Sequence, residues 1–319
     1  MANNTFSSSF INKRLGDVRV MTYNIYGYKW YPDKANSPHL SSGPVSLRQE
    51  MERDLIAEYA PDVLAMQEYH SNFHEGMTPM LNSIGYTEVE AYHPTRTHQS
   101  GAHFNYTPLF YRADRLNLID KAFVHFPETM PDPSKDDGSV LNINDIGSKS
   151  ITWAVFEDIS TGKRFIAVCT HFMYSAAWLT PAQSNEARTN NALLLVDTVK
   201  ALREKEEYKG LPVIMGGDLN TWPVSSPIAA LKNGGFEHLY DIAEVKDDSR
   251  GLKAYATYDK NLGEYVTMPE PTDNPAQVID YLMLMQGDTA AKVGSYITIT
   301  DRNALLSSDH CPRIADITF

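Results

Sequence analysis

The 319-residue sequence predicts a single α/β domain built on a parallel or mixed β-sheet. Strand-like and helix-like segments interleave from residue 18 to residue 319, which is the pattern of α/β folds. Over residues 18–68 a strand, a helix and a second strand follow one another through short joints, an order typical of neighbouring parallel strands. No internal repeat or low-complexity linker interrupts the sequence after residue 17, so one domain is expected at 18–319.

The first half of the chain alternates short apolar runs with amphipathic segments. Residues 18–25, VRVMTYNI, are apolar and β-branched and predict a buried strand. Residues 44–60 place apolar side chains at every fourth position and predict a helix. The other elements expected in this half are a strand at 62–68, a helix at 72–84, and strands at 107–112 and 118–126.

The second half opens with a predicted hairpin. The strand-like runs SITWAVFEDI (150–159) and RFIAVCTHF (164–172) are joined by the turn sequence STGK. Residues 185–207 predict the longest helix. The other elements expected here are a strand that ends in GGDLN (216–220), a helix at 227–233, a loop-rich region to about 276, and strands at 278–285, 295–300 and 313–319.

Residues 1–17, MANNTFSSSFINKRLGD, are expected to form a flexible N-terminal leader. They lack the basic and apolar regions of a signal peptide. The alternative is a stub left by a removed export signal, which leaves a secreted or periplasmic location open. No run approaches the roughly 20 apolar residues of a membrane span, so we expect a soluble protein, and a monomer.

Two residue types that often bind metals show no metal-binding spacing. Cys169 and Cys311 match no zinc motif. Cys169 lies in an apolar run, so an inert buried thiol is expected, and a disulfide between the two cysteines is the alternative. Five histidines fall within residues 70–103. We expect them to be scattered over the surface, with a second metal site or a cleft lining as the alternatives.

Polar side chains recur where the predicted strands end. The set comprises Asn24, Glu68, His171, Asp218, Asn220, Asp280, Asp309 and His310. Each alone is equally typical of a turn. In α/β proteins, however, ligands bind in the crevice outside strand ends. The two glycines before Asp218 are expected to let the backbone turn sharply and approach a ligand.

Asp280 argues most strongly against a plain turn. Its neighbours in VIDYL are apolar and predict burial, and a buried carboxylate needs a partner. His310, which enters another buried strand, could supply that partner as an Asp–His pair.

Acids and amides without a cysteine cluster form an oxygen-ligand site for a hard cation, Mg²⁺ or Mn²⁺. A histidine oriented by an aspartate takes a proton from water, and a second histidine donates to developing negative charge. The set predicts metal-assisted hydrolysis of a phosphate ester.

Six segments resemble, in order, the motifs of the endonuclease/exonuclease/phosphatase superfamily. They are MTYNI, VLAMQE, CTHF, GGDLN, VIDYL and SSDHCP, and they extend from residue 21 to residue 312. The superfamily includes pancreatic deoxyribonuclease, abasic-site endonucleases, inositol polyphosphate 5-phosphatases and neutral sphingomyelinases. The resemblance implies a four-layer α/β sandwich, with two packed mixed β-sheets flanked by helices and the active site at one end of the sheets.

The resemblance also implies which residues bind the metal and which residues transfer protons. Glu68 would be the principal Mg²⁺ ligand, with Asn24 close to both metal and phosphate. Asp309 would lie near the metal, directly or through water. His310, oriented by Asp280, would activate water or stabilise the phosphoryl group.

Three further residues complete the implied site. Asp218 would position the attacking water, and Asn220 would contact the phosphate. His171 would assist the phosphoryl oxygen or the leaving group. Members of the superfamily differ over which group is the base and which is the acid, so the proton roles stay open.

Two departures weaken an assignment to the nucleases. Tyr26 stands where abasic-site endonucleases carry an acid. Tyr69 and His70 follow the metal-binding Glu, where deoxyribonuclease-like enzymes often place an Arg. Tyr26 and Trp30 belong to an aromatic run that we interpret as a stacking wall for substrate, with packing of a long loop as the alternative.

We therefore predict a divalent-metal phosphoesterase that hydrolyses phosphodiesters, or phosphomonoesters, of small or lipid-derived substrates. The net charge of −12 favours these substrates, because a nucleic-acid binder normally presents a basic surface. A DNA or RNA endonuclease or exonuclease is the alternative, since bound cations can reverse the field at a site. A non-catalytic binding module is the third reading, and the complete set of acids, amides and imidazoles argues against it.

Overall fold

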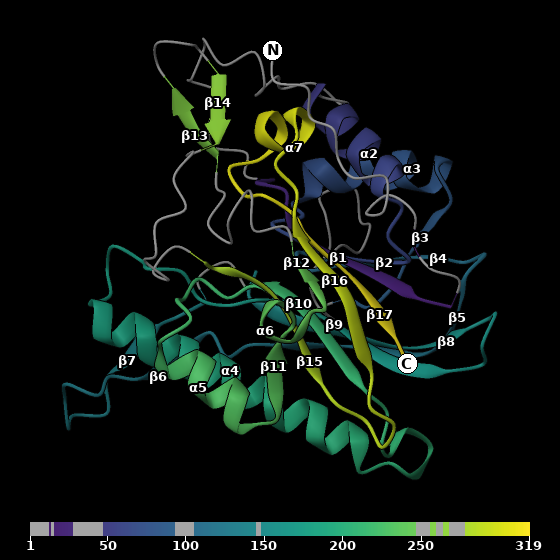
Figure 1. Cartoon of the computed structure of the whole chain (residues 1–319). Coiled ribbons are helices and arrows are strands. Elements are labelled where there is room, and N and C mark those ends of the chain that lie inside the picture. The colour runs from purple at the N-terminus through teal and green to yellow at the C-terminus, as the bar shows by residue number, and fades with distance from the viewer. Residues whose placement is uncertain are drawn as a thin grey trace.

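Two mixed β-sheets pack face to face between two layers of helices (Figure 1). This arrangement confirms the α/β class and the four-layer sandwich. The computed structural model describes residues 13, 16–27, 47–92, 105–144, 148–246, 256–259, 264–267 and 278–319. The leader expected at 1–17 therefore lies almost wholly outside the described residues.

The first sheet has seven strands among the described residues. Strand β1 pairs in parallel with β2 and antiparallel with β17, so the sheet is mixed as predicted. Its order is β12 (Val245–Lys246), β16 (Lys292–Thr298), β17 (Arg313–Thr318), β1 (Val18–Asn24), β2 (Val63–Gln67), β4 (Leu109–Arg112) and β3 (Tyr86–Glu88).

The second sheet has six strands among the described residues. Strand β10 pairs in parallel with β9 and antiparallel with β15, and β8 with β9 forms the predicted hairpin. Its order is β11 (Phe236–His238), β15 (Asp280–Met285), β10 (Val213–Asp218), β9 (Arg164–His171), β8 (Ser150–Asp158) and β5 (Leu116–His125). Two separate hairpins are β6 (Thr129–Pro131) with β7 (Val140–Asn142), and β13 (Ala256–Asp259) with β14 (Glu264–Thr267).

The helices cover the outer faces of the sheets (Figure 1). Helices α2, α3 and α7 lie on the side of the first sheet, and α4 and α5 on the side of the second. The helices are α2 (Leu47–Tyr59), α3 (Ser71–Ser83), α4 (Pro181–Arg203), α5 (Ser226–Asn233), α6 (Leu239–Ile242) and α7 (Arg302–Ser307), with a 3₁₀ turn at Glu206–Tyr208. No helix in the described part of the chain has the length and hydropathy needed to cross a membrane.

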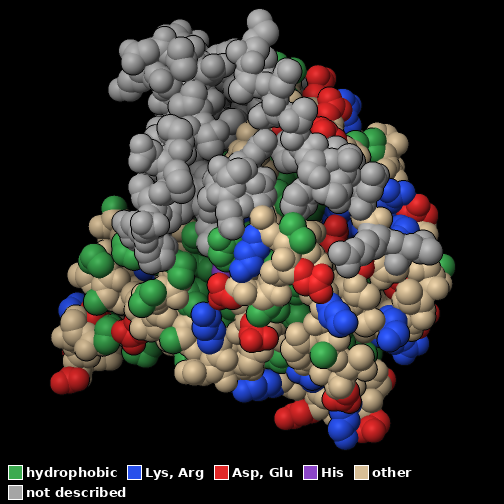
Figure 2. Space-filling model, in the orientation of Figure 1, with side chains coloured by type: hydrophobic (Ala, Val, Ile, Leu, Met, Phe, Trp, Pro, Cys, Tyr) green, Lys and Arg blue, Asp and Glu red, His purple; other side chains and the backbone are tan. Residues whose placement is uncertain are grey.

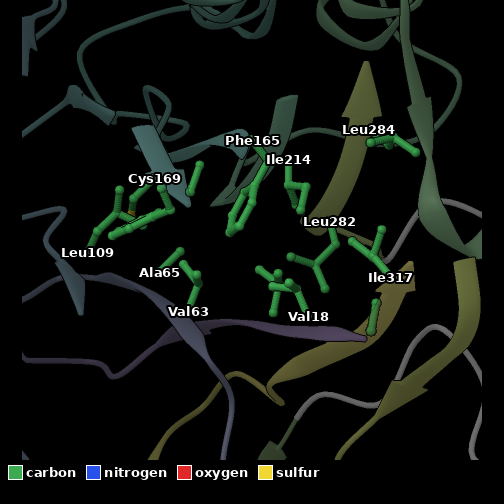
Figure 3. Packing of buried hydrophobic residues seen from close by; sticks show 14 of the residues in the cluster. Val18, Val63, Ala65, Leu109, Phe165, Cys169, Ile214, Leu282, Leu284 and Ile317 are labelled. Atoms are coloured by element: carbon green, nitrogen blue, oxygen red, sulfur yellow. The ribbon is translucent and has the colours of Figure 1, made fainter. Parts of the chain in front are cut away.

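Successive side chains of a strand point to opposite faces of its sheet. In the central strands both faces are buried, one against the other sheet and one against the helices. In β1, Val20 packs between the sheets while Met21 packs against the helices. In β9, Phe165 packs between the sheets while Ile166 faces the helices of the other side. Figure 3 shows the inter-sheet layer, where side chains from both sheets meet, among them Val18, Val63, Ala65, Phe165, Cys169, Ile214 and Leu282.

Helix α4 begins four residues before the predicted start. Thr180 and Gln183 form a capping box, in which the Thr180 hydroxyl accepts from the Gln183 amide at 3.2 Å and the Gln183 side chain accepts from the Thr180 amide at 2.9 Å. The region predicted to be loop-rich also contains short elements, from β11 to β14. They are too short for a periodic pattern to appear in the sequence.

Both cysteines are buried free thiols, so the disulfide alternative is wrong. The Cys169 thiol donates to the backbone oxygen of Met66 at 3.1 Å in the other sheet. Burial raises the pKa of Cys169 beyond the usual range of a thiol, as expected for an inert residue.

Gly216 and Gly217 do not make a turn, contrary to our expectation. Both lie within β10, which continues to Asp218. They are required by packing: a Cβ on Gly217 would stand 2.5 Å from the backbone oxygen of Thr170, and one on Gly216 would press on Thr22 in the other sheet at 3.0 Å. The glycines therefore allow close contact between strands and between sheets.

We expect Gly217→Ala to lower the free energy of unfolding by about 1–3 kcal/mol, the usual cost of overpacking a core. The added methyl meets backbone of a central strand, which cannot move aside. Gly294→Ala is the control, because the nearest atom to its Cβ would lie at 3.7 Å. Denaturant titration of both variants measures the difference, and equal stabilities would contradict the packing explanation.

Candidate active site

The structure brings all eight strand-end residues together at one end of the two sheets. The first sheet contributes Asn24, Glu68, Asp309 and His310, and the second contributes His171, Asp218, Asn220 and Asp280. The topology explains this. The parallel pairs β1–β2 and β9–β10 end at this edge, and the antiparallel strands β15 and β17 begin there.

Asn24 lies at the centre of the cluster and joins the two sheets. Its amide nitrogen Nδ2 lies 3.2 Å from Glu68 Oε1, 3.0 Å from Asp218 Oδ2 and 3.4 Å from His310 Nε2. The side chain is buried, and the Ser308 hydroxyl donates to its backbone oxygen at 2.6 Å. The amide of Asn24, at the end of β1, therefore contacts residues from the ends of three other strands.

Asp280 and His310 form the expected pair across the sheets. The ring nitrogen Nδ1 lies 2.9 Å and 3.1 Å from the two carboxylate oxygens. This contact turns Nε2 toward Asp218 Oδ2 and Asp309 Oδ1, each 3.9 Å away. Burial alone would lower the pKa of His310, but the charge and hydrogen bond of Asp280 outweigh it and hold the pKa well above its ordinary value.

Asp218 is buried at the end of β10. Its Oδ1 accepts from the Asn220 backbone amide at 2.9 Å, which forms an Asx-turn. Burial raises the pKa of Asp218 to about 7, against the opposing charge of His310. A carboxyl group with such a pKa is suited to exchange protons near neutral pH.

The Nε2 atom of His171 has two close nitrogen neighbours and a more distant carboxylate. It lies 2.7 Å from the ammonium of Lys149 and 3.1 Å from the side-chain nitrogen of Asn220. Asp218 Oδ2 lies further away, at 3.4 Å. Burial lowers the pKa of His171 well below its ordinary value, and the positive charge of Lys149 lowers it further.

The sequence analysis did not identify Lys149, which is 5% exposed. It directly precedes β8, and β8 runs antiparallel to β9, so the start of one strand lies beside the end of the other. The predicted hairpin already implied that the start of β8 lies beside the end of β9. A lysine before a strand is usually a solvated loop residue, however, and no local pattern sets Lys149 apart.

Strained backbone gathers at the site. Three of the four non-glycine residues with positive φ in the described chain are Tyr26 (49°), Glu68 (59°) and Asn220 (49°). Gly27 packs so closely on the backbone of Glu68 that any Cβ there would overlap its carbonyl oxygen. Such conformations persist only where the surroundings impose them, and they cluster at functional sites.

The side chains of Glu68 and Asp309 fit the oxygen-ligand site predicted for a hard cation. Asp309 Oδ1 is buried and has no hydrogen-bond partner, which leaves a carboxylate oxygen available. Burial raises the pKa of Glu68, and a bound cation would offset this penalty. Donor atoms of Asp218, Asp280 and His310 also lie within 4.8 Å of one another. Because Asp280 already holds the ring of His310, we interpret that trio as the proton-handling part of the site.

The predicted aromatic wall is only partly described. The guanidinium of Arg48 lies 5.7 Å from the ring centroid of Tyr26, and its Nη1 donates to the Tyr26 backbone oxygen at 2.8 Å. Trp30 lies outside the described residues. Trp222, two residues after Asn220, is 56% exposed and was not singled out in the sequence.

The histidines of 70–103 form no metal cluster within the described residues. Burial lowers the pKa of His70 to about 4, and its ring packs against Tyr106 at 5.0 Å. His74 lies 3.4 Å from Glu88. The two described histidines are thus partly buried rather than scattered over the surface, while His93, His98 and His103 lie outside the described residues.

Comparisons with known proteins show the family and the fold of the chain. The chain is 23% identical to the CCR4-Not complex 3'-5'-exoribonuclease subunit Ccr4 of Candida glabrata over an alignment of 299 positions that covers 85% of this chain and 33% of the relative. The chain thus spans about a third of that relative's length. A crystal structure of an endonuclease/exonuclease/phosphatase from Bacteroides vulgatus has a TM-score of 0.66 and 23% identity, covering 94% of this chain and 98% of that one.

A mannosyl-6-phosphatase of Bacteroides thetaiotaomicron has the same TM-score, 0.66, with 19% identity, and the match covers 95% of this chain and all of that one. At these identities the structural matches establish the fold. The model of the Endonuclease/Exonuclease/phosphatase family matches residues 21–310, which contain every strand-end residue of the site. The chain belongs to the Endonuclease/Exonuclease/phosphatase family of metal-dependent phosphoester hydrolases.

Proposed function

We propose that this phosphoesterase hydrolyses small or lipid-derived phosphoesters by direct attack of water, assisted by an Asp–His pair and a divalent cation. One observation carries the proposal. His310, held by Asp280 at 2.9 Å, turns its Nε2 toward Asp218 and Asn24 at the end of the sandwich where residues from both sheets meet.

Glu68, Asp309 and the side-chain oxygen of Asn24 are the proposed metal ligands, and Mg²⁺ or Mn²⁺ is the proposed ion, since hard cations prefer oxygen ligands. When bound, the ion would polarise the phosphoryl group and neutralise part of its charge. Asn24 also fixes the two acids, because its amide spans Glu68 and Asp218.

The attacking water is proposed to bind at Asp218, whose Oδ2 lies beside Asn24, His171 and His310. Asp218 accepts a proton from this water as the new P–O bond forms and the P–O bond to the leaving alcohol breaks, and the departing alkoxide takes up a proton from solvent. The His310 ring, kept in position by Asp280, donates from Nε2 to a phosphoryl oxygen that gains negative charge. Asn220 is placed by its Asx-turn to contact the same phosphate.

Surface charge supports small substrates over nucleic acid. Acidic and basic side chains are interspersed on the described surface in Figure 2, and no basic stripe is visible on that face. The net charge is −12. The relatives named above include a sugar phosphatase and an exoribonuclease, so a DNA or RNA nuclease is the second candidate.

A panel of esters tests both candidates. Bis-p-nitrophenyl phosphate, p-nitrophenyl phosphate, a phospholipid, supercoiled plasmid and single-stranded RNA are each incubated with Mg²⁺, Mn²⁺ or EDTA. We expect the nitrophenyl esters, the phospholipid or both to be hydrolysed only with metal. Faster turnover of plasmid or RNA, with steep salt dependence, would favour the nuclease. If none of the esters is hydrolysed in a metal-dependent way, the proposed reaction is refuted.

A further inference from the structure

Arg188 is a buried cation of helix α4 that the proposed reaction does not use. It is 7% exposed, and its Nη1 donates to the backbone oxygen of Met173 at 3.3 Å and to the Ser175 hydroxyl at 3.4 Å, both long for hydrogen bonds. Its Nε is buried without a hydrogen-bond partner, and no carboxylate in the described part of the chain forms an ion pair with the guanidinium. A buried charge that is held so weakly favours an anionic partner.

A second side chain on the same face of α4 also lacks a partner. Ser184 lies four residues before Arg188, a spacing that makes side chains neighbours on a helix. It is 1% exposed, and its hydroxyl oxygen has no hydrogen-bond partner among the described residues. Asn191, further along this face, accepts from the Met173 backbone amide at 3.0 Å. This face of α4 therefore packs against the loop after β9 and keeps two unpaired polar groups there, which is uncommon for buried atoms.

The loop that Arg188 contacts continues directly from the active site. It follows His171, and its Phe172 backbone oxygen accepts from the Asn220 side chain at 3.2 Å. Burial lowers the pKa of Arg188, and the charge of Asp218 opposes this effect. In the described part of the chain, however, the guanidinium makes no hydrogen bond to a strand-end residue of the site. Arg188 thus lies beside the proposed phosphate position rather than within it.

We propose that Arg188 binds a second anionic group of the substrate, a carboxylate or a phosphate, beside the phosphate that is hydrolysed. This inference rests on the proposed function and narrows its substrates to phosphoesters with two anionic groups. A guanidinium suits the role because its planar fork donates two parallel hydrogen bonds to either group. Ser175 is exposed, so the Arg188 Nη1 beside it lies close to the surface that such a group would approach.

Three esters with the same six-carbon skeleton test this subsite. Glucose 6-phosphate has one anionic group, 6-phosphogluconate adds a carboxylate, and glucose 1,6-bisphosphate adds a second phosphate. With Mg²⁺ we expect kcat/KM for phosphate release to be at least about 10-fold higher for one or both doubly anionic esters, the usual gain from a hydrogen bond to a charged group. Their order shows which anion the subsite prefers. Equal values for all three esters would overturn the proposal.

Arg188→Gln removes the charge but keeps a donor for the Met173 carbonyl. It should lower kcat/KM about 10–10²-fold on the preferred doubly anionic ester and less than about threefold on glucose 6-phosphate. Arg188→Lys, which keeps the charge, should recover part of the loss. If Arg188 only holds the loop, all three esters lose equally, and the proposal fails. Arg203→Gln, in the last turn of the same helix, is the matched control and should leave the three values unchanged.

A binding measurement separates this inference from the proposed function. Each ester is titrated calorimetrically into native protein and Arg188→Gln in EDTA, which prevents metal-dependent turnover. We expect a doubly anionic ester to bind native protein at least about 10-fold more tightly than glucose 6-phosphate, and the variant to lose this advantage. No advantage in native protein, or one that persists in the variant, refutes the subsite even if esters are hydrolysed. The expected pattern without hydrolysis of any ester supports the subsite, and only the proposed reaction is lost.

Discussion

Replacing His310 with Gln is expected to lower kcat by about three orders of magnitude, within the range contributed by acid–base and charge-stabilising groups. Asp280 holds the ring by Nδ1 at 2.9 Å and turns Nε2 into the site. Gln retains polarity but cannot carry the positive charge that Asp280 stabilises. Steady-state kinetics at saturating ester and metal give the effect on kcat.

A double-mutant cycle with Asp280→Asn tests whether the ring and the carboxylate act as one unit. Residues that act together are strongly non-additive, so the double variant should be about as slow as the slower single variant. His74→Gln, in α3, is the control and should retain kcat. Fully additive losses, or native turnover in His310→Gln, would contradict the assignment.

Glu68→Gln is expected to abolish detectable Mg²⁺ binding and to lower kcat/KM at least about 10³-fold. The amide occupies nearly the same volume but removes the charge of the principal proposed ligand, and hard cations bind carboxylates in preference to amides. Calorimetric titration of Mg²⁺ measures the binding directly, without reliance on turnover. Glu206→Gln, which removes an exposed carboxylate, should change neither quantity.

The same variant should be more stable than the native protein when EDTA removes metal. Burial raises the pKa of Glu68 in the folded state above its unfolded value. A raised carboxyl pKa means that the ionised form costs stability, a cost that is absent at low pH and grows as pH rises through the unfolded value. At pH 7 the uncharged Gln avoids it. A lower Tm for Glu68→Gln in EDTA would contradict this electrostatic account.

The strand-end residues could be located from the sequence because the apolar runs that predict the strands also show where each strand ends. Apolar runs such as VRVMTYNI are buried on both faces, so a polar residue at their end must lie at the sheet edge. Asp280 was the clearest case, since its apolar neighbours required a buried partner. The structure supplies that partner as His310 at 2.9 Å.

Other features depend on neighbours that are distant in sequence. Gly217 resembled a turn residue, and only the contact with Thr170 of the adjacent strand shows why a side chain is excluded. Lys149 enters the site through the register of β8 against β9. The capping box at Thr180 was readable in the letters TPAQ, but the apolar periodicity used to place the helix begins later.

The contacts Asp280–His310 and Asn24–Asp218 each join one sheet to the other. The alignment of the catalytic side chains therefore depends on how the two sheets pack against each other. A shift of one sheet against the other by a fraction of an ångström would separate proton donor from acceptor while every strand stayed intact. On heating, turnover should fail before circular dichroism reports any loss of strands. Small side chains of the inter-sheet layer, such as Ala65, then offer a way to tune the rate from a distance.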